Sequence, residues 1–130
     1  MVNIIIAADS RYSVNKNLIR QTVVDALGKH KISGQVEIGV NIVGDRKMHE
    51  LNHKYRGIDS TTDILSFGLQ DPSSTGFAAY PDRILRLGDI VISHAQARED
   101  AVLDGISLDD EIRFLLEHGI DHLLGFHHPE

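Results

Sequence analysis

Four of the eight histidines of the chain lie within eleven residues, in the segment HGIDHLLGFHH at 118–128. His118 and His122 are four residues apart and would share one face of a helix. Gly125 would let the backbone turn, so that His128 can approach the first two. Three imidazoles at one point suit zinc with an open fourth position, and nickel or iron are alternatives. The spacing therefore predicts a metal site that activates water or polarises a bound oxygen.

Two other features of the histidine pattern leave alternatives open. His127 adjoins His128 and could compete with it as a ligand, and either His127 or Asp121 could close the site as a fourth, purely structural ligand. His49 and His53 form a second pair with the same spacing. No third histidine stands at a matching offset, so we expect this pair to face solvent and to hold no metal.

The spacing H-x-x-x-H-x-x-G-x-x-H is also that of the metzincin zinc proteases, which place a glutamate directly after the first histidine as general base. Here that position is Gly119, which carries no titratable group. Glu117 would point about 100° away around the helix, which makes it a poor substitute. The pattern thus predicts zinc-type geometry without the peptidase base, and another hydrolytic reaction is favoured.

The metal histidines need a helix to hold them, and the sequence predicts one over about 108–124. Ser107 with Asp110 fits a capping box, and Asp109, Asp110 and Glu111 in the first turn favour the positive end of the helix dipole. Gly125 would end the helix. The apolar stripe of this helix comprises Leu108, Ile112, Leu115, Leu116 and Leu123.

The remaining elements indicate an α+β domain spanning residues 1–130, with a small mixed sheet of about four strands packed with helices. Met48, Leu51, Asn52 and Tyr55 are expected to form the inner stripe of the second helix. Residues 70–82 have turn-forming composition and are expected to form a long loop. The predicted elements are strands at 3–7, 36–42, 62–67 and 84–92, a helix over 14–30 capped by Ser13, a helix over 46–56 capped by Asp45, and a helix from Ser93, boxed with Gln96, to about 103.

Composition and charge narrow the function classes. The absence of cysteine excludes disulfides and thiolate metal sites. The apolar N-terminal stretch is too short for a signal peptide or a membrane span, so a cytoplasmic protein is expected. The net charge of -6 argues against a general nucleic-acid binder. Residues 98–121 carry eight acids against two bases, whereas 46–56 carry four bases against Glu50 alone, a contrast that by itself is typical of solvated helix faces.

At this point the sequence resembles a known family. HGIDHLLGFHH resembles the HGxLHLxGYDH signature of the YbeY endoribonucleases, which act in ribosomal RNA maturation. LNHKYRGIDSTTDILSF at 51–67 resembles the family segment LNxxYRxxDxPTDVLSF, and LGDIVIS at 87–93 resembles its LGDIxIS strand. The three motifs cover about residues 40–128. Asp121 replaces the usual leucine, His127 the usual aspartate, and Ser60 or Thr61 the usual proline.

The resemblance implies a metal-dependent endoribonuclease that cleaves single-stranded RNA in processing of the 16S ribosomal RNA 3' end and in ribosome quality control. It implies His118, His122 and His128 as metal ligands and Arg56 as a functionally important arginine. Ribosomal RNA and ribosome-associated proteins would be its partners, and neither DNA nor a membrane is expected. Arg56 could instead form a structural ion pair with Asp59 or Asp63.

The basic stretch acquires a role from this resemblance. Arg56 is expected to neutralise charge that develops on the scissile phosphate, beside the metal. Arg46, Lys47 and Lys54 on the same helix are expected to hold neighbouring phosphates as substrate-binding residues. Two other functions stay open: a zinc-dependent hydrolase of another substrate class, such as peptides, and a non-catalytic ribosome-associated metalloprotein.

Overall fold

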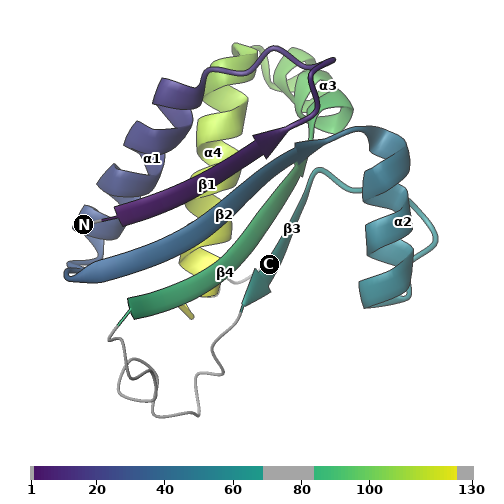
Figure 1. Cartoon of the computed structure of the whole chain (residues 1–130). Coiled ribbons are helices and arrows are strands. Elements are labelled where there is room, and N and C mark those ends of the chain that lie inside the picture. Colours follow the sequence, from purple (N-terminus) through teal and green to yellow (C-terminus); the bar gives the residue numbers. More distant parts are fainter. Residues whose placement is uncertain (1, 69–83, 126–130) are drawn as a thin grey trace.

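The computed structural model describes residues 2–68 and 84–125 of the chain. The loop expected over 70–82, together with His127 and His128, lies outside these residues. The elements, in chain order, are β1 (Val2–Ala8), α1 (Lys16–Lys29), β2 (Gln35–Val43), α2 (Asp45–Arg56), β3 (Ile64–Gly68), β4 (Ile84–Ser93), α3 (His94–Asp104) and α4 (Leu108–Leu123) (Figure 1). The described order matches the predicted one.

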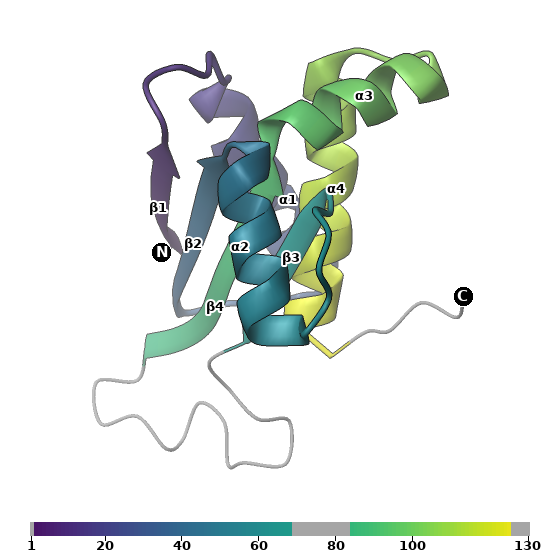
Figure 2. The same ribbon diagram turned by 90° about the vertical axis from the view of Figure 1, so that its right-hand side faces the viewer.

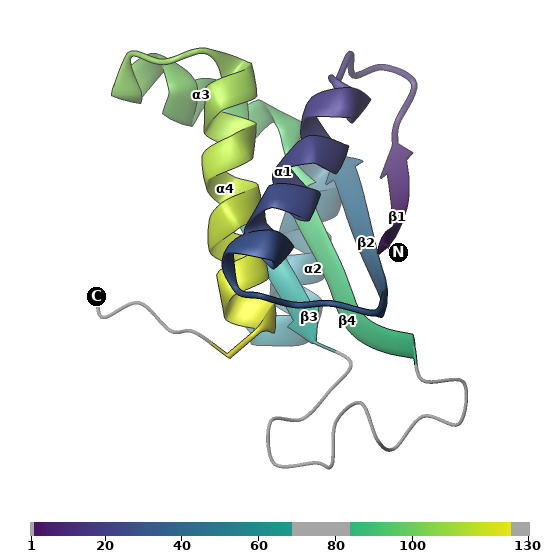
Figure 3. The same cartoon turned by 90° about the vertical axis from the view of Figure 1, so that its left-hand side faces the viewer.

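The four strands form one mixed sheet in the order β1-β2-β4-β3. β1 pairs parallel with β2 and β2 parallel with β4, whereas β3 pairs antiparallel with β4 and forms one edge of the sheet. α1 and α4 lie side by side against one face of the sheet (Figure 3). α2 lies on the other face, over β3 and β4 (Figure 2). This arrangement confirms the predicted α+β class.

The main core lies between the sheet and the helices α1 and α4. The alternation read in the sequence holds, because the apolar side chains of β2 are buried: Val36, Ile38, Val40 and Ile42. A smaller cluster of Met48, Leu65 and Val91 attaches α2 to the other face. None of the helices within the described residues is long and apolar enough to cross a membrane.

The start of α1 differs from the expectation. Asn15, not Ser13, is the N-cap, and its side-chain oxygen accepts a hydrogen bond from the Leu18 N–H at 3.1 Å. The buried face is shifted with it. Ile19 is fully buried, whereas Val24 is 46% exposed.

Asp45 does not cap α2, as the sequence suggested, but begins it. The N-cap is Gly44, which offers no side-chain hydrogen bond. The Asp45 carboxylate instead accepts hydrogen bonds from the hydroxyls of Thr61 and Ser93 and from the Gln96 amide, the last two at 3.0 and 3.1 Å. Burial by itself would raise the pKa of Asp45, but these hydrogen bonds outweigh it and lower the pKa. One carboxylate thus ties α2 to the start of α3 and to the segment before β3.

The caps of the last two helices agree with the sequence. Ser93 Oγ accepts from the Gln96 N–H at 3.2 Å, and Ser107 Oγ accepts from the Asp110 N–H at 3.0 Å. After α4, Gly125 adopts φ +88, the left-handed conformation that glycine takes most readily. The helix that carries the candidate metal histidines therefore begins and ends as predicted.

Glu111, one of the three acids in the first turn of α4, is only 2% exposed. Burial raises its pKa to about 7, helped by a hydrogen bond with Asp104 and by repulsion from Asp104, Asp100 and Asp63. Burial, with Asp63 close by, also raises the pKa of Asp100 to about 6. The corner between α3 and α4 therefore holds two carboxyl groups, Glu111 and Asp100, whose pKa values are raised toward neutral pH.

This cluster predicts how stability depends on pH. The pKa of Glu111 is higher in the folded than in the unfolded chain, so the free energy of unfolding should fall between pH 4.5 and 7 and stay low above pH 7. Glu111→Gln keeps a hydrogen-bond donor toward Asp104 and removes the charge. At about 1.4 kcal/mol per pKa unit, it should raise the free energy of unfolding at pH 8 by up to about 3 kcal/mol, and by much less at pH 5.

Urea unfolding at the two pH values measures the effect, with Asp109→Asn, an exposed acid of the same turn, as control. A Glu111→Gln variant that is no more stable than the parent at pH 8 would show that the carboxyl is charged there without penalty.

Candidate metal site

The structure brings together three of the predicted site residues that come from distant parts of the chain. His118 and His122 lie in the last turns of α4, with ring centroids 5.4 Å apart and ring planes at 43°. Both line a cleft of about 320 Å³, and Arg56, the last residue of α2, lines the same cleft. β3 lies between the two helices (Figure 2). The cleft therefore offers two imidazoles and one guanidinium to a shared ligand.

The chemistry of the cleft fits a metal bound by nitrogen ligands. Two imidazoles one helical turn apart can point ring nitrogens at one ion, and His118 is half-buried while His122 is exposed. Among residues 2–68 and 84–125, no group of three or more histidine or carboxylate side chains lies close enough to hold a metal. Two candidate ligands are thus described, and His128 as the third stays a prediction.

Asp121, which the sequence offered as a closing ligand, is engaged elsewhere. Its Oδ1 lies 2.7 Å from Nε2 of His30, at the C-terminal end of α1, and both side chains are largely buried. The pair joins the C-terminal ends of α1 and α4, and both residues line a pocket that includes neither His118 nor His122. This geometry does not favour a site closed by Asp121.

Arg56 is positioned by the attachments of α2. Asp45 fixes the start of the helix, Met48 is fully buried against the sheet, and the Asn52 side-chain amide donates to the Ser60 carbonyl at 2.9 Å. Gly57, with φ +70, then ends the helix directly after Arg56. The guanidinium is thereby placed at the cleft by the way the helix is held.

The ion pair considered for Arg56 does not form. Within the described part of the chain Arg56 pairs with neither Asp59 nor Asp63. Asp59 instead lies 2.7 Å from Nε2 of His49, and the hydrogen bond from His49 lowers the Asp59 pKa, with the charges of His49 and His53 adding to the effect. His49 and His53 are exposed, as expected for a surface pair.

Gly119 packs against the sheet at the position where metzincins carry their base. A Cβ on it would lie 3.0 Å from Ile64 Cδ1, 3.1 Å from Ile90 Cδ1 and 3.3 Å from Ser66 Oγ. A glutamate here would have to enter the tight contact between α4 and strands β3 and β4. The missing peptidase base is therefore a consequence of how closely α4 approaches the sheet.

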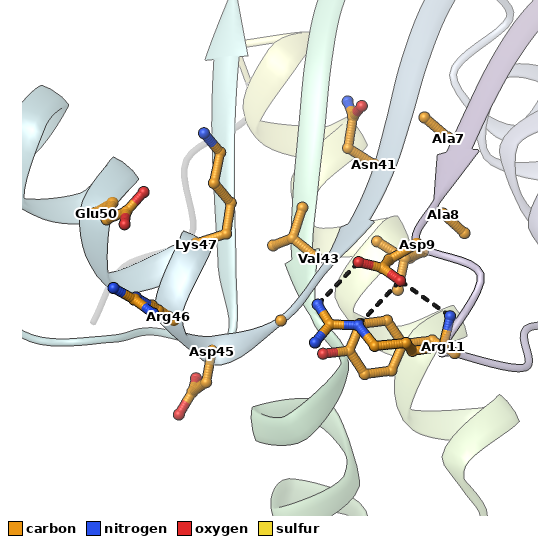
Figure 4. A pocket seen from close by; sticks show the side chains of 13 residues that line it. Ala7, Ala8, Asp9, Arg11, Asn41, Val43, Asp45, Arg46, Lys47 and Glu50 are labelled. Carbon is orange, nitrogen blue, oxygen red and sulfur yellow. Dashed lines mark hydrogen bonds and ion pairs between the residues drawn. The ribbon is translucent and has the colours of Figure 1, made fainter.

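The expected phosphate-binding residues do not form one patch. Arg46 and Lys47 lie at the start of α2, about 15 Å along the helix axis from Arg56. They line a separate pocket of about 690 Å³. There Arg11 pairs with Asp9 at 2.9 Å (Figure 4). Only Lys54 lies in the same helical turn as Arg56.

Sequence reasoning missed two polar residues of the cleft, Thr62 and Ser66. Both stand at even positions of the β3 segment, as does Ile64, and alternation along a strand places such residues on one face. The alternation along this segment could be read from the sequence. Which residues would meet α4 could not be read, because that depends on how the helix packs against the sheet.

Comparisons with known proteins identify the family. A family model described as Endoribonuclease YbeY matches residues 5–130. The Endoribonuclease YbeY of Desulfitobacterium hafniense is 40% identical over 115 residues, which cover 87% of this chain and 72% of that protein. The protein of the same name from Roseiflexus sp. is 41% identical over 115 residues, covering 88% and 71%.

A solved structure shares the fold. The solution structure of TM1509 from Thermotoga maritima matches with a TM-score of 0.60, covering 99% of this chain and 75% of that one. The two chains are 23% identical, so this likeness bears on the fold alone.

The close packing at Gly119 can be tested with two alanine substitutions. Glycine to alanine within a helix normally stabilises by about 1 kcal/mol. Gly28→Ala in α1, where a Cβ meets nothing within 4 Å, should show this gain. Gly119→Ala should lower the free energy of unfolding by about 1–2 kcal/mol, because the new methyl group overpacks the contact with Ile64 and Ile90. Urea unfolding of both variants decides the matter, and equal stabilisation would contradict the packing argument.

Proposed function

The chain belongs to the YbeY family of endoribonucleases, and we propose on that premise that it hydrolyses phosphodiester bonds of single-stranded RNA at the cleft between α2 and α4. The observation that supports this assignment is the convergence of Arg56 with His118 and His122 on one cleft. Neither helix alone offers both a metal-binding pair and a fixed cation. Their meeting gives the combination that phosphodiester hydrolysis needs.

The family is metal-dependent, and we propose zinc held by His118, His122 and His128, with nickel or iron as alternatives that imidazole ligands also suit. When bound, such an ion supplies Lewis acidity and a water of lowered pKa near neutral pH. The helix holds the two described imidazoles side by side, so little reorganisation is needed to bind the ion.

Arg56 has a separate task in this proposal. The non-bridging oxygens of a phosphodiester gain negative charge as water attacks, and the guanidinium can donate two parallel hydrogen bonds to them. The anchoring of α2 holds this donor in place before the substrate arrives. Lys54, two residues before Arg56 in the same helical turn, adds positive potential for the neighbouring phosphate.

For the substrate, we propose ribosomal RNA, at the 3' end of 16S RNA, with ribosome-associated proteins as partners and the cytoplasm as the place of action. Family membership supports this assignment. A protein with a net charge of -6 is not attracted to RNA in general. We therefore infer that its association with the ribosome brings it to its substrate. The peptidase alternative is not favoured, since the position of its base is packed against the sheet.

Substitutions at the cleft separate the roles of arginine and metal. Arg56→Ala should lower the rate of cleavage of single-stranded RNA by about 100-fold or more, the usual effect of removing one preorganised donor, while the metal content stays unchanged. His118→Ala should lose both metal and cleavage. Arg113→Ala, an exposed arginine on α4, serves as control and should match the parent.

Cleavage assays together with elemental analysis of protein purified without a histidine tag measure these effects. Full activity of Arg56→Ala would remove the arginine from the mechanism. A His118→Ala variant that keeps both its metal and its activity would remove the metal site.

A further inference from the structure

Tyr55 was expected on the inner stripe of α2, yet it is 56% exposed. Its ring meets the ring of Phe67 edge-on, with centroids 5.2 Å apart and planes at 68°. The ammonium of Lys54 lies 5.1 Å from the centroid of the Tyr55 ring. The ring is thus held from two sides while more than half of the residue remains accessible, an arrangement that suits contact with a ligand better than core packing.

A pocket of about 480 Å³ adjoins this ring. Its floor is apolar and includes Leu51, Phe67 and Val91, whereas its polar lining residues are Lys47, Asn41 and Asp89. The volume falls within the range of about 300–1,000 Å³ that is usual for small-ligand pockets. A flat apolar ring with polar edges and an attached anion matches this lining: the ring against Tyr55 and the floor, the edges toward the Asn41 amide, the anion toward Lys47.

The pocket and the cleft are neighbours, because both are lined by residues of α2 and of β3. Ser66 and Arg56 line the cleft, whereas the next residue of the strand, Phe67, and the preceding residue of the helix, Tyr55, line the pocket. Successive residues of a strand point to opposite faces. Because β3 is an edge strand, a nucleic-acid strand can pass around it from one face to the other (Figure 2).

We propose that this pocket, lined by Tyr55 and Phe67, is a nucleobase subsite that receives an unstacked base of the single-stranded RNA whose phosphate lies at Arg56. The proposal rests on the proposed endoribonuclease function and adds a binding site to it. It also gives Lys47 a role in substrate binding. Lys47 is too far from Arg56 to share a phosphate with it, but it lines the base pocket and can contact a phosphate there.

The physical consequence is a preference for single strands without a preference for sequence. Stacking on an aromatic ring is open to every base, because each has a π-face, but a base within a duplex is already stacked and paired. Tyr55 thus favours single-stranded RNA over duplex RNA.

The test measures binding in place of cleavage. The probe is a fluorescent single-stranded oligoribonucleotide with 2'-O-methyl sugars, which resists hydrolysis, read by anisotropy with chelator present. Stacking on one aromatic ring is worth about 1–3 kcal/mol, so Tyr55→Ala should weaken binding by about 10-fold or more. Tyr55→Phe keeps the ring and should bind within about 3-fold of the parent. Phe114→Ala, which removes an aromatic residue 61% exposed on α4, is the matched control and should bind as the parent does.

An abasic version of the same probe separates stacking from any change of fold. It should bind the parent more weakly than the normal probe does, and Tyr55→Ala should then cost nothing further. Tyr55→Leu, which fills space without a π-face, should behave as Tyr55→Ala.

The outcomes distinguish the two proposals. Unchanged binding of Tyr55→Ala and Tyr55→Leu to the normal probe, in a protein whose cleavage still depends on Arg56, overturns the base pocket alone and leaves the aromatic pair as a protein-contact surface. Equal loss of affinity with the normal and abasic probes also overturns it. A parent protein that neither binds the probe nor cleaves RNA overturns the proposed function as well.

Discussion

The carboxylate of Asp45 is the contact on which the placement of α2 depends. It accepts hydrogen bonds from Thr61, Ser93 and Gln96, and so joins the start of α2 to the segment before β3, to the end of β4 and to α3. Loss of a partner in such a network leaves buried polar groups unpaired, which costs more than the bond itself contributes. These hydrogen bonds fix the direction of α2. The C-terminal end of the helix carries Tyr55 and Arg56, so the positions of both residues depend on how Asp45 is held.

The second constraint is the close approach of α4 to the sheet. Gly119 allows the helix to rest against Ile64, Ile90 and Ser66 so closely that a Cβ would lie only 3.0–3.3 Å from their side-chain atoms. This approach brings His118 and His122 level with the residues of β3 that line the cleft, and it also leaves no place for a glutamate in the position that metzincins use. One packing contact therefore sets the histidine geometry and removes peptidase chemistry together.

Between these two helices, β3 divides the region into two faces with different character. The cleft beside α4 is lined by Thr62, Ser66 and the two imidazoles, with the Arg56 guanidinium reaching it from α2, and it suits a phosphate. The face toward α2 carries Phe67 with Tyr55 and suits a flat apolar group. A single-stranded nucleic acid offers both kinds of group in alternation along its length, whereas a peptide does not. The short edge strand thus links the proposed chemistry to the proposed binding.

Much of this protein was determined by local sequence. The alternation of β2, the caps at Ser93 and Ser107, the end of α4 at Gly125 and the shared face of His118 and His122 all follow from residues a few positions apart, and all agree with the structure. The family motifs likewise pointed to Arg56. What the sequence missed depends on contacts between distant segments. Asp45 was read as a cap because its partners lie 16 to 51 residues away. The periodicity of α4 did not reveal the burial of Glu111 at the corner with α3. Tyr55 was expected on the inner stripe of α2 but is 56% exposed. Arg46 was expected to hold a phosphate near that of Arg56 but lines a separate pocket. Only the tertiary structure could decide these, since burial and proximity are set by which elements pack together and not by the periodicity of any one of them.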